Sequence, residues 1–293
     1  MIVVTAATGN IGSKLTDILL SKGKKVRVVG RDAKKLEAFK TRGAEPFVGD
    51  AEKPEDMKKA FQGADILFML IPPKLNDPNA RDYYNRVGHV YADAVLAAGV
   101  KELIFLSSIG AHLGEKNGPI AGLHDQEQRL NGLKGVNTLH LRPGYFMENL
   151  LWNVGLIKEK GINGSPLKGN VPINMIATKD IAQFAAVHIL TGVDRTLTQE
   201  LLGERDVTME EATAAIGKAI GKPELKYVQF PYEEAEKAML GMGMGKGTAA
   251  LFNEMYRGFN EGVILPTERR TKQNTTTTSI EEFAKVFAQA YNK

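Results

Sequence analysis

Residues able to hold a phosphate group occur in a turn near the start of the chain. Residues 6–12 read Ala-Ala-Thr-Gly-Asn-Ile-Gly and lead into apolar residues at helical spacing as far as Gly23. The glycines let the backbone approach a pyrophosphate, whose charge is favoured at a helix N-terminus. Ala6 replaces the first glycine of the usual three-glycine fingerprint and would be strained at a positive φ. A strand-to-helix connection without a ligand is the alternative.

Basic side chains follow the next strand, where dinucleotide folds contact the ribose. The run Val-Arg-Val-Val at residues 26–29 ends at Gly30 and Arg31, and Lys34 and Lys35 come next. An acidic residue would bind the 2′-hydroxyl of NAD here, whereas an arginine accommodates the 2′-phosphate of NADP. A phosphate also explains cations at a helix start, where the helix dipole disfavours them. The alternative is that they are simply solvated.

Two further candidate contacts stand at strand ends, where parallel sheets bind ligands. Asp50 follows a short strand at residues 46–48, and it could bind an adenine amino group or cap the next helix. Pro72 follows the apolar run of residues 64–71, so we expect it to line the same crevice.

Ser107 and Ser108 end another buried strand, and we expect both hydroxyls to face this crevice. Other chemistries find no support. The chain has no cysteine, its five histidines show no metal-ligand spacing, and it has no Gly-x-Ser-x-Gly nucleophile motif.

These residues require a scaffold of alternating strands and helices. Strand-like runs occur at residues 2–5, 26–29, 46–48, 64–71, 103–108 and 138–141, with helical patterns between them. The alternation predicts an α/β fold, a Rossmann-type doubly wound parallel sheet. An apolar stripe between Val87 and Ala98 fits either the core or a subunit interface, which leaves a homodimer open.

A smaller C-terminal α/β substrate domain is predicted because the pattern changes after residue 150. The expected division is residues 1–155 for the nucleotide-binding domain, with 175–200 returning to it, and 156–174 plus 201–293 for the smaller part. Capping boxes at Thr208 and Ser279 predict helices that start near residues 209 and 280.

Composition sets the broad class of the protein. The chain has 293 residues, a net charge of +4, 43% hydrophobic and 25% charged residues, which is ordinary for a soluble globular protein. The mild charge argues against nucleic acid or a membrane surface as partner. No apolar run approaches the ~20 residues that cross a bilayer, and no secretory signal is evident, so we expect a cytoplasmic protein.

Several segments together point to a family. The first turn and Gly30-Arg31 occur with Ser-Ser-Ile-Gly-Ala at 107–111, Arg-Pro-Gly-Tyr-Phe-Met-Glu-Asn at 142–149 and Thr-Lys-Asp-Ile-Ala at 178–182. Residues 1–200 resemble the NmrA-like branch of the atypical short-chain dehydrogenase/reductases, and the remainder matches mainly in layout. The resemblance implies a Rossmann fold, NADP(H) as cofactor and a small-molecule acceptor.

The motifs and the resemblance together give the expected cofactor contacts: Thr8, Gly9, Asn10, Ile11, Gly12, Arg31, Lys35, Asp50, Pro72, Ser107, Gly144, Tyr145 and Phe146. An acceptor pocket is expected around Met147, Asn149 and Trp152, with Met242, Met244, Phe252 and Tyr256 as further candidates. The Gly/Met-rich segment 241–247 could be a lid or only a helix connection.

The catalytic residues are less evident. Typical short-chain dehydrogenases use Ser, Tyr and Lys, but no Tyr-x-x-x-Lys occurs between Ser108 and Arg142. Relatives often carry Lys or His where this chain has Leu123, and its histidine is one residue later, at His124. One residue is about 100° of helix rotation, so His124 is either a displaced proton donor or a surface residue. The candidate catalytic residues are Ser107, His124 and Tyr145.

The sequence therefore predicts an NADPH-dependent oxidoreductase that transfers hydride to a quinone-like or other planar apolar acceptor. A quinone needs little general-acid help, so positioning alone could suffice. The alternative, which Leu123 keeps open, is an NADP(H)-sensing regulatory protein with little turnover. A nucleotide-sugar epimerase is disfavoured because it depends on the missing Tyr-Lys pair.

Overall fold

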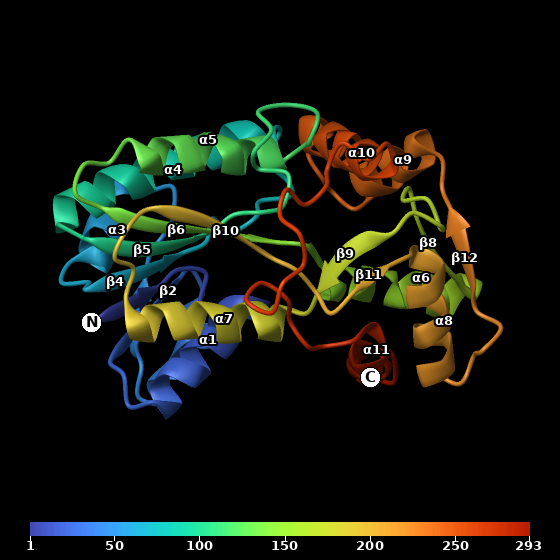
Figure 1. Ribbon diagram of the computed structural model, residues 1–293, viewed down its shortest axis with the longest axis horizontal. Helices are drawn as coiled ribbons and strands as arrows, with labels where there is room; N and C mark the ends of the chain where they lie inside the picture. Colours follow the sequence, from blue (N-terminus) through green and yellow to red (C-terminus); the bar gives the residue numbers. More distant parts are fainter.

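A seven-stranded parallel sheet forms the larger part of the protein (Figure 1). The computed structural model describes residues 1–293 and gives the strand order β10-β6-β5-β4-β1-β2-β3. The strands are β1 (Ile2–Val4), β2 (Val26–Gly30), β3 (Glu45–Val48), β4 (Ile66–Met69), β5 (Glu102–Leu106), β6 (Asn137–Pro143) and β10 (Leu197–Leu201). Every neighbouring pair is parallel, which confirms the doubly wound α/β sheet.

Helices cover both faces of this sheet (Figure 1). One face carries α1 (Asn10–Ser21), α2 (Ala33–Lys40) and α7 (Thr178–Thr191), and the other carries α3 (Pro54–Phe61), α4 (Ala80–Ala98) and α5 (Ile120–Asn131). Successive strand residues point to opposite faces, so Val4 is buried beneath α1 and Val3 beneath α4. The strands are therefore continuous apolar runs. The α4 stripe around Val87 and Tyr91 belongs to this core.

The smaller part lies beyond the carboxyl ends of β5 and β6 (Figure 1). It contains β7 (Tyr145–Phe146), the 3-10 helix η1 (Met147–Asn153), α6 (Val154–Lys160), β8 (Ile162–Ser165), β9 (Ile173–Ile176), β11 (Asp206–Val207), α8 (Met209–Ala219), β12 (Lys226–Gln229), α9 (Tyr232–Gly241), α10 (Lys246–Asn260) and α11 (Ile280–Tyr291). Both predicted capped starts are confirmed, because Thr208 and Ser279 accept the backbone N–H groups of Glu211 and Glu282.

A long connection, residues 261–279, runs between the two parts from α10 to α11 (Figure 1). We call it the strap. It is fastened at several points, including Thr278, whose Oγ1 donates to Asp180 of α7 at 2.7 Å, and Asn274, whose carbonyl accepts from Leu202 at 2.7 Å. The strap therefore has a defined path past the carboxyl end of β10 and the start of α7.

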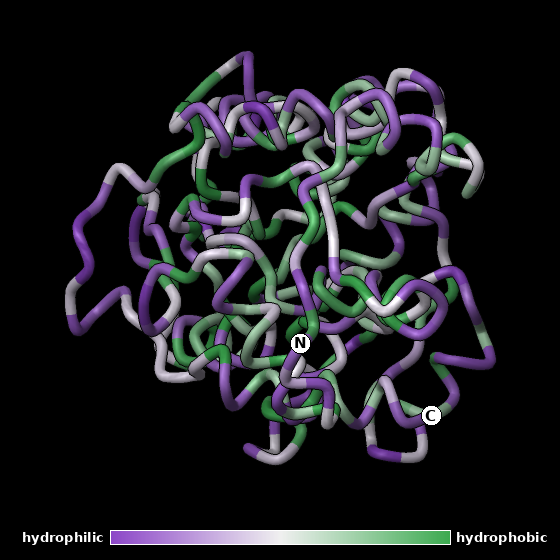
Figure 2. Tube along the Cα trace, turned by 90° about the vertical axis from the view of Figure 1, so that its right-hand side faces the viewer, coloured by the Kyte–Doolittle hydropathy of each residue, from purple (hydrophilic) through white to green (hydrophobic).

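The hydropathy of the chain follows this layering. Figure 2 shows hydrophilic segments mainly in the outer turns and hydrophobic segments mainly inside. None of the helices combines the length and the apolar character that a membrane crossing requires.

Candidate active site

A cavity of about 920 Å³ lies at the carboxyl ends of β1, β2, β3 and β4. Nine of the predicted cofactor contacts line it: Thr8, Gly9, Asn10, Ile11, Arg31, Lys35, Asp50, Pro72 and Phe146. Gly12, Ser107, Gly144 and Tyr145 do not. The fold thus gathers residues from five separate segments into one elongated space, which we call the cofactor cavity.

The first turn presents free backbone amides to this cavity. Gly9 is the N-cap of α1, and no side chain caps the first turn of the helix. Gly12 has another role: a Cβ there would lie 2.6 Å from the carbonyl oxygen of Ala6, so this glycine permits close packing of helix on strand. Ala6 itself has φ +48°, the strained left-handed conformation in which a glycine would be favoured.

Three cations surround the far end of the cavity. Arg31, Lys34 and Lys35 are exposed, line the cavity and make no ion pair. The nearby carboxylate of Asp32 is directed to the backbone, where it caps α2 by accepting the N–H of Lys35 at 3.1 Å. The local charge is therefore suited to an anion.

Asp50 does not cap α3, so that alternative is wrong. The N-cap residue of α3 is Lys53, whereas Asp50 accepts the N–H of Glu52 at 3.1 Å within the preceding turn. Asp50 lines the cofactor cavity, and its contact with adenine stays a prediction.

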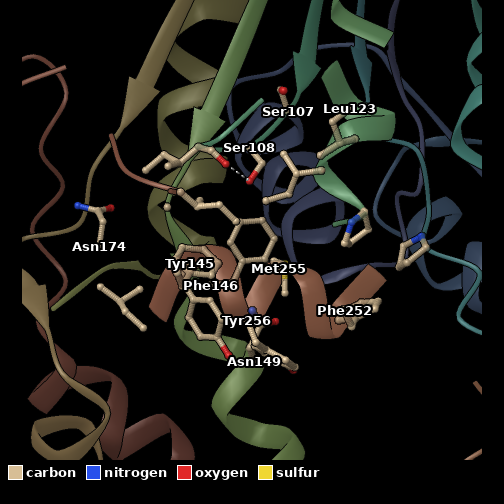
Figure 3. Close-up of a pocket in the computed structure, with 18 of the residues that line it drawn as sticks. Ser107, Ser108, Leu123, Tyr145, Phe146, Asn149, Asn174, Phe252, Met255 and Tyr256 are labelled. Carbon is tan, nitrogen blue, oxygen red and sulfur yellow. Dashed lines mark hydrogen bonds between the residues drawn. The ribbon is translucent and has the colours of Figure 1, made fainter. Parts of the chain in front are cut away.

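A second cavity, of about 420 Å³, lies between the large sheet and the smaller part (Figure 3). Leu70, Pro73 and Phe146 line both cavities, so the two adjoin. Seven aromatic side chains line the second cavity: Tyr84, Tyr145, Phe146, Trp152, Phe252, Tyr256 and Phe259. We call it the acceptor pocket.

Helix α10 supplies one side of this pocket. Phe252, Met255, Tyr256 and Phe259 all line it from one helical face, and Figure 3 shows the first three directed into the space. An apolar stripe at helical spacing is typical of a buried core face, so the sequence predicts only Phe252 and Tyr256 as pocket residues.

The two serines after β5 point in different directions. Ser107 is buried and donates its hydroxyl to Glu127 of α5 at 2.5 Å, whereas Ser108 is directed toward the aromatic residues of the pocket (Figure 3). Alternation along an extended chain makes it unfavourable for neighbours to face the same side. Both serines line the acceptor pocket, but the Ser107 hydroxyl is turned away to Glu127, so the expectation holds for the hydroxyl of Ser108 only.

Glu127 belongs to a buried ion pair behind the pocket wall. Arg142 donates to both of its carboxylate oxygens, with Nε 2.9 Å from Oε1, and only 2% and 11% of the Glu127 and Arg142 side chains are exposed. Such a pair fixes the geometry of the groups around it and is costly to break. It anchors Ser107, so the structure gives the Ser107 hydroxyl a structural partner instead of a substrate.

The displaced histidine does not reach the pocket. Leu123 lines the pocket, while the Nδ1 of His124 lies 2.8 Å from the carbonyl oxygen of Ala111, outside the lining. Rotation by one helical position explains the difference. A role for His124 as proton donor therefore has no geometric support.

Tyr145 lines the pocket beside Asn149, with its ring edge-on to Phe259 at 6.0 Å between centroids. Burial raises the pKa of the Tyr145 hydroxyl well above its usual value, so it stays protonated and can donate a hydrogen bond. No lysine stands beside it to lower that pKa.

Some of the other predicted pocket residues line the acceptor pocket, and others do not. Asn149 and Trp152 line the pocket, whereas Met147 is 1% exposed and belongs to the core of the smaller part. Met242 is exposed on the surface and Met244 packs in a separate small cluster, so neither lines the pocket.

The segment 241–247 is a helix connection, not a lid. Gly245 is the N-cap residue of α10, and its N–H donates to the carbonyl of Leu75 at 2.9 Å. A Cβ at Gly245 would lie 1.8 Å from the carbonyl oxygen of Asp77. The connection is therefore packed tightly against the loop that follows β4.

Comparison with known proteins agrees with this geometry. The sequence pattern of the NmrA-like family matches residues 1–284. The chain belongs to the NmrA-like family. It is an NAD(P)-binding member of this family.

Similar proteins of this group include reductases. An NAD(P)H azoreductase of Xenophilus azovorans is 29% identical over 298 residues, covering 99% of each chain. The fold is shared with the triphenylmethane reductase of Citrobacter sp. complexed with NADP(H), at a TM-score of 0.80 and 22% identity over 98% and 100% of the two chains. An NADPH-dependent quinone oxidoreductase of Escherichia coli, complexed with NADPH, has a TM-score of 0.79 and 21% identity over 97% and 98%.

Proposed function

We propose that this protein is an NADPH-dependent oxidoreductase that transfers hydride to a quinone-like or other planar apolar acceptor. The observation that carries the proposal is the joining of a cation-rimmed cavity to an aromatic pocket at Leu70, Pro73 and Phe146. A nucleotide lying along the first cavity would bring its reactive ring to the wall of the second.

The residues present fit NADPH. The uncapped first turn of α1 at Gly9 and Asn10 would hold the pyrophosphate, because free amides and the helix dipole favour an anion. Arg31, Lys34 and Lys35 would hold the 2′-phosphate, since none has an acidic partner. The nicotinamide supplies a hydride when it is bound.

The pocket suits an acceptor that needs little acid catalysis. Among its lining residues the carboxylate of Asp206 is paired with Arg270, and the hydroxyls of Tyr145 and Tyr256 have pKa values raised by burial, that of Tyr256 to about 12. Hydride addition to a quinone yields a hydroquinone anion, which takes its proton from water. Tyr145 would orient the acceptor oxygen by donating a hydrogen bond, whereas the Ser108 hydroxyl donates to the carbonyl of Ile109 at 2.9 Å.

A second candidate is an NADP(H)-sensing protein with little turnover. The observation that favours it is Leu123, an apolar residue at the pocket position where relatives often carry a proton donor. Both candidates bind NADPH, and they differ in whether an acceptor oxidises it.

Binding and turnover together test the proposal. The protein is titrated with NADPH and with NADH, and nicotinamide absorbance is then followed with a panel of quinones and dyes. The oxidoreductase predicts preferential NADPH binding and oxidation that depends on both protein and acceptor. Tight binding of NADPH without its oxidation by any acceptor would contradict the oxidoreductase and favour the NADP(H)-sensing protein.

A substitution of Arg31 tests whether this residue binds the 2′-phosphate of NADPH. We expect Arg31→Ala to weaken NADPH binding about tenfold and to leave NADH binding nearly unchanged, because a charge-assisted phosphate contact contributes about 1.5 kcal/mol. Arg195→Ala is the matched control, since Arg195 is also exposed but precedes the amino end of β10, away from the cavity. Equal losses for the two cofactors in Arg31→Ala would contradict the assignment.

A further inference from the structure

Three polar side chains from separate elements meet at the border of the cofactor cavity. Thr178 begins α7 and lines this cavity, Glu148 belongs to η1, and Lys14 belongs to α1. The backbone N–H of Thr178 donates to the two carboxylate oxygens of Glu148 at 3.1 and 3.0 Å, and its hydroxyl donates to Oε1. The Nζ of Lys14 donates to Thr178 Oγ1 at 2.8 Å and lies 3.6 Å from Glu148 Oε1. We call these three residues the Glu148 cluster.

The Glu148 cluster supplies a cap that α7 cannot make for itself. The N-cap residue of α7 is Ala177, which has no side-chain acceptor for the free N–H groups of the first turn. Glu148 provides this acceptor from a different element, and the helix dipole favours its negative charge there. Only 12% of the Glu148 side chain is exposed, so its carboxylate depends on these donors for the hydrogen bonds that water would otherwise supply. The contact is therefore costly to lose.

This contact lies directly beyond Phe146, which lines both cavities. β7 pairs with β9 in parallel, with Phe146 opposite Ile176. Glu148 and Thr178 are each two residues further along, so their contact continues the pairing after the two strands end. Trp152, near the other end of η1, lines the acceptor pocket. Glu148 therefore fixes a segment that carries walls of both cavities.

The start of α7 is also held independently of Glu148. Asp180, in the same first turn, accepts hydrogen bonds from the N–H of Thr278 at 3.2 Å and from its hydroxyl at 2.7 Å. Ile181 and Ala182 are fully buried in the core between α7 and the large sheet. Loss of the Glu148 carboxylate would therefore release η1 and the adjoining β7, while α7 keeps its place.

We propose that Glu148 is a positioning residue for hydride transfer: by binding Thr178 it holds Phe146 and η1 against the cofactor cavity, and so aligns the acceptor with the reactive ring of the nucleotide. Glu148 and Lys14 line neither cavity, so the carboxylate acts through the residues that it fixes and not on a reacting atom. The effect on turnover rests on the proposed function, whereas the effect on the placement of η1 does not. A misplacement of about 1 Å can slow a reaction by about a hundredfold, so a small displacement of this wall is sufficient.

Hydrogen exchange tests which element is released. We expect Glu148→Ala to raise amide exchange in residues 145–153 roughly tenfold and to leave exchange in α7 beyond its first turn unchanged. Glu148→Gln should restore part of the protection, because its amide oxygen still accepts the Thr178 N–H. Glu211→Ala is the matched control, since this carboxylate also accepts an N–H at a helix start, that of Thr208 at 2.7 Å, but lines neither cavity. It is expected to leave exchange in residues 145–153 unchanged.

Single-turnover kinetics test the consequence for hydride transfer. NADPH affinity is measured first, and the oxidation of bound NADPH by saturating 1,4-benzoquinone is then timed. We expect Glu148→Ala to slow this oxidation roughly tenfold with NADPH affinity nearly unchanged, Glu148→Gln to recover part of the rate, and Glu211→Ala to behave as the wild type. Lys14→Met, which removes only the cation of the Glu148 cluster, is the milder variant if Glu148→Ala fails to fold, and it should slow oxidation several-fold.

Two results would overturn the positioning role. One is an unchanged oxidation rate and unchanged exchange in Glu148→Ala and Lys14→Met. The other is an equal loss of NADPH affinity and of oxidation rate, because it would indicate general damage to the site. If the wild type binds NADPH but no quinone oxidises it, the proposed function itself fails. Normal turnover in every variant leaves that function standing and removes only the role of Glu148.

Discussion

At the scale of single residues, the pocket contains few groups that titrate near neutrality, and the strongly perturbed histidine lies behind it. His140 of β6 is 1% exposed, its Nε2 lies 2.8 Å from Asn131 Oδ1, and its Nδ1 has no partner. Burial lowers the pKa of this histidine to about 4, with Glu127 opposing the shift and Arg142 adding to it.

The stability of the fold should therefore depend on pH through His140. Its neutral form is native, so its stabilising effect is complete above pH 6.5 and is lost as the pH falls toward 4, an amount of about 3 kcal/mol. Urea unfolding of His140→Gln at pH 7 and pH 4.5 should show a smaller loss than the wild type. His112→Gln, at an exposed histidine, should keep the wild-type loss. An equal loss of unfolding free energy between pH 7 and pH 4.5 in all three proteins would contradict the role of His140.

Residue types and strand ends were enough to predict most of the cofactor cavity. The turn before α1, the cations after β2 and Pro72 after β4 are contributed by short local segments of a known topology. The distinction between Ser107 and Ser108 was missed, because it depends on which residue ends the strand. Glu127, twenty residues away, decides it by capturing one hydroxyl.

At the scale of elements, features set by local sequence could again be predicted, whereas features set by tertiary packing could not. The starts of α8 and α11 were predictable from their capping residues, since a cap is a local hydrogen bond. The role of α10 was not, because its apolar stripe has the same spacing whether it faces a core or a pocket. The tertiary structure shows that this face borders the acceptor pocket, because Phe252, Met255 and Tyr256 line it.

The close packing at the start of α10 predicts how a substitution there affects the acceptor pocket. A Cβ at Gly245 would clash with the Asp77 carbonyl, so Gly245→Ala should shift the start of α10, raise the acceptor KM several-fold and destabilise the fold by about 1–3 kcal/mol. Gly241→Ala is the matched control, because a Cβ at Gly241 meets nothing within 4 Å. NADPH affinity should be little changed in both. An unaltered acceptor KM in Gly245→Ala would show that α10 does not set the pocket.

At the scale of the whole molecule, the charge is unevenly distributed. Residues 14–45, which include the cavity-lining Arg31, Lys34 and Lys35, hold ten basic and four acidic side chains, whereas the rest of the chain holds 28 and 30. The net charge of +4 therefore conceals a positive segment, and its Arg31, Lys34 and Lys35 give a local positive field to the cavity that we assign to an anionic cofactor. The composition of the whole chain gives only a small net charge and does not show where the positive charge lies.

This field should accelerate cofactor association. We expect the association rate of NADPH, measured by stopped-flow fluorescence, to fall roughly tenfold between low and high salt, with a smaller change in dissociation. Lys53→Glu, beside the cavity but outside its lining, should slow association, whereas Lys285→Glu on α11 should not. A salt-independent rate would argue against steering.

The most direct test of hydride transfer is a single turnover with labelled cofactor. NADPH carrying deuterium at one or the other position of nicotinamide C4 is mixed with excess protein and 1,4-naphthoquinone, and the loss of nicotinamide absorbance is timed. If the two cavities work together as proposed, oxidation requires the protein and shows a primary isotope effect for one position only. Bound NADPH that no quinone oxidises would contradict the oxidoreductase.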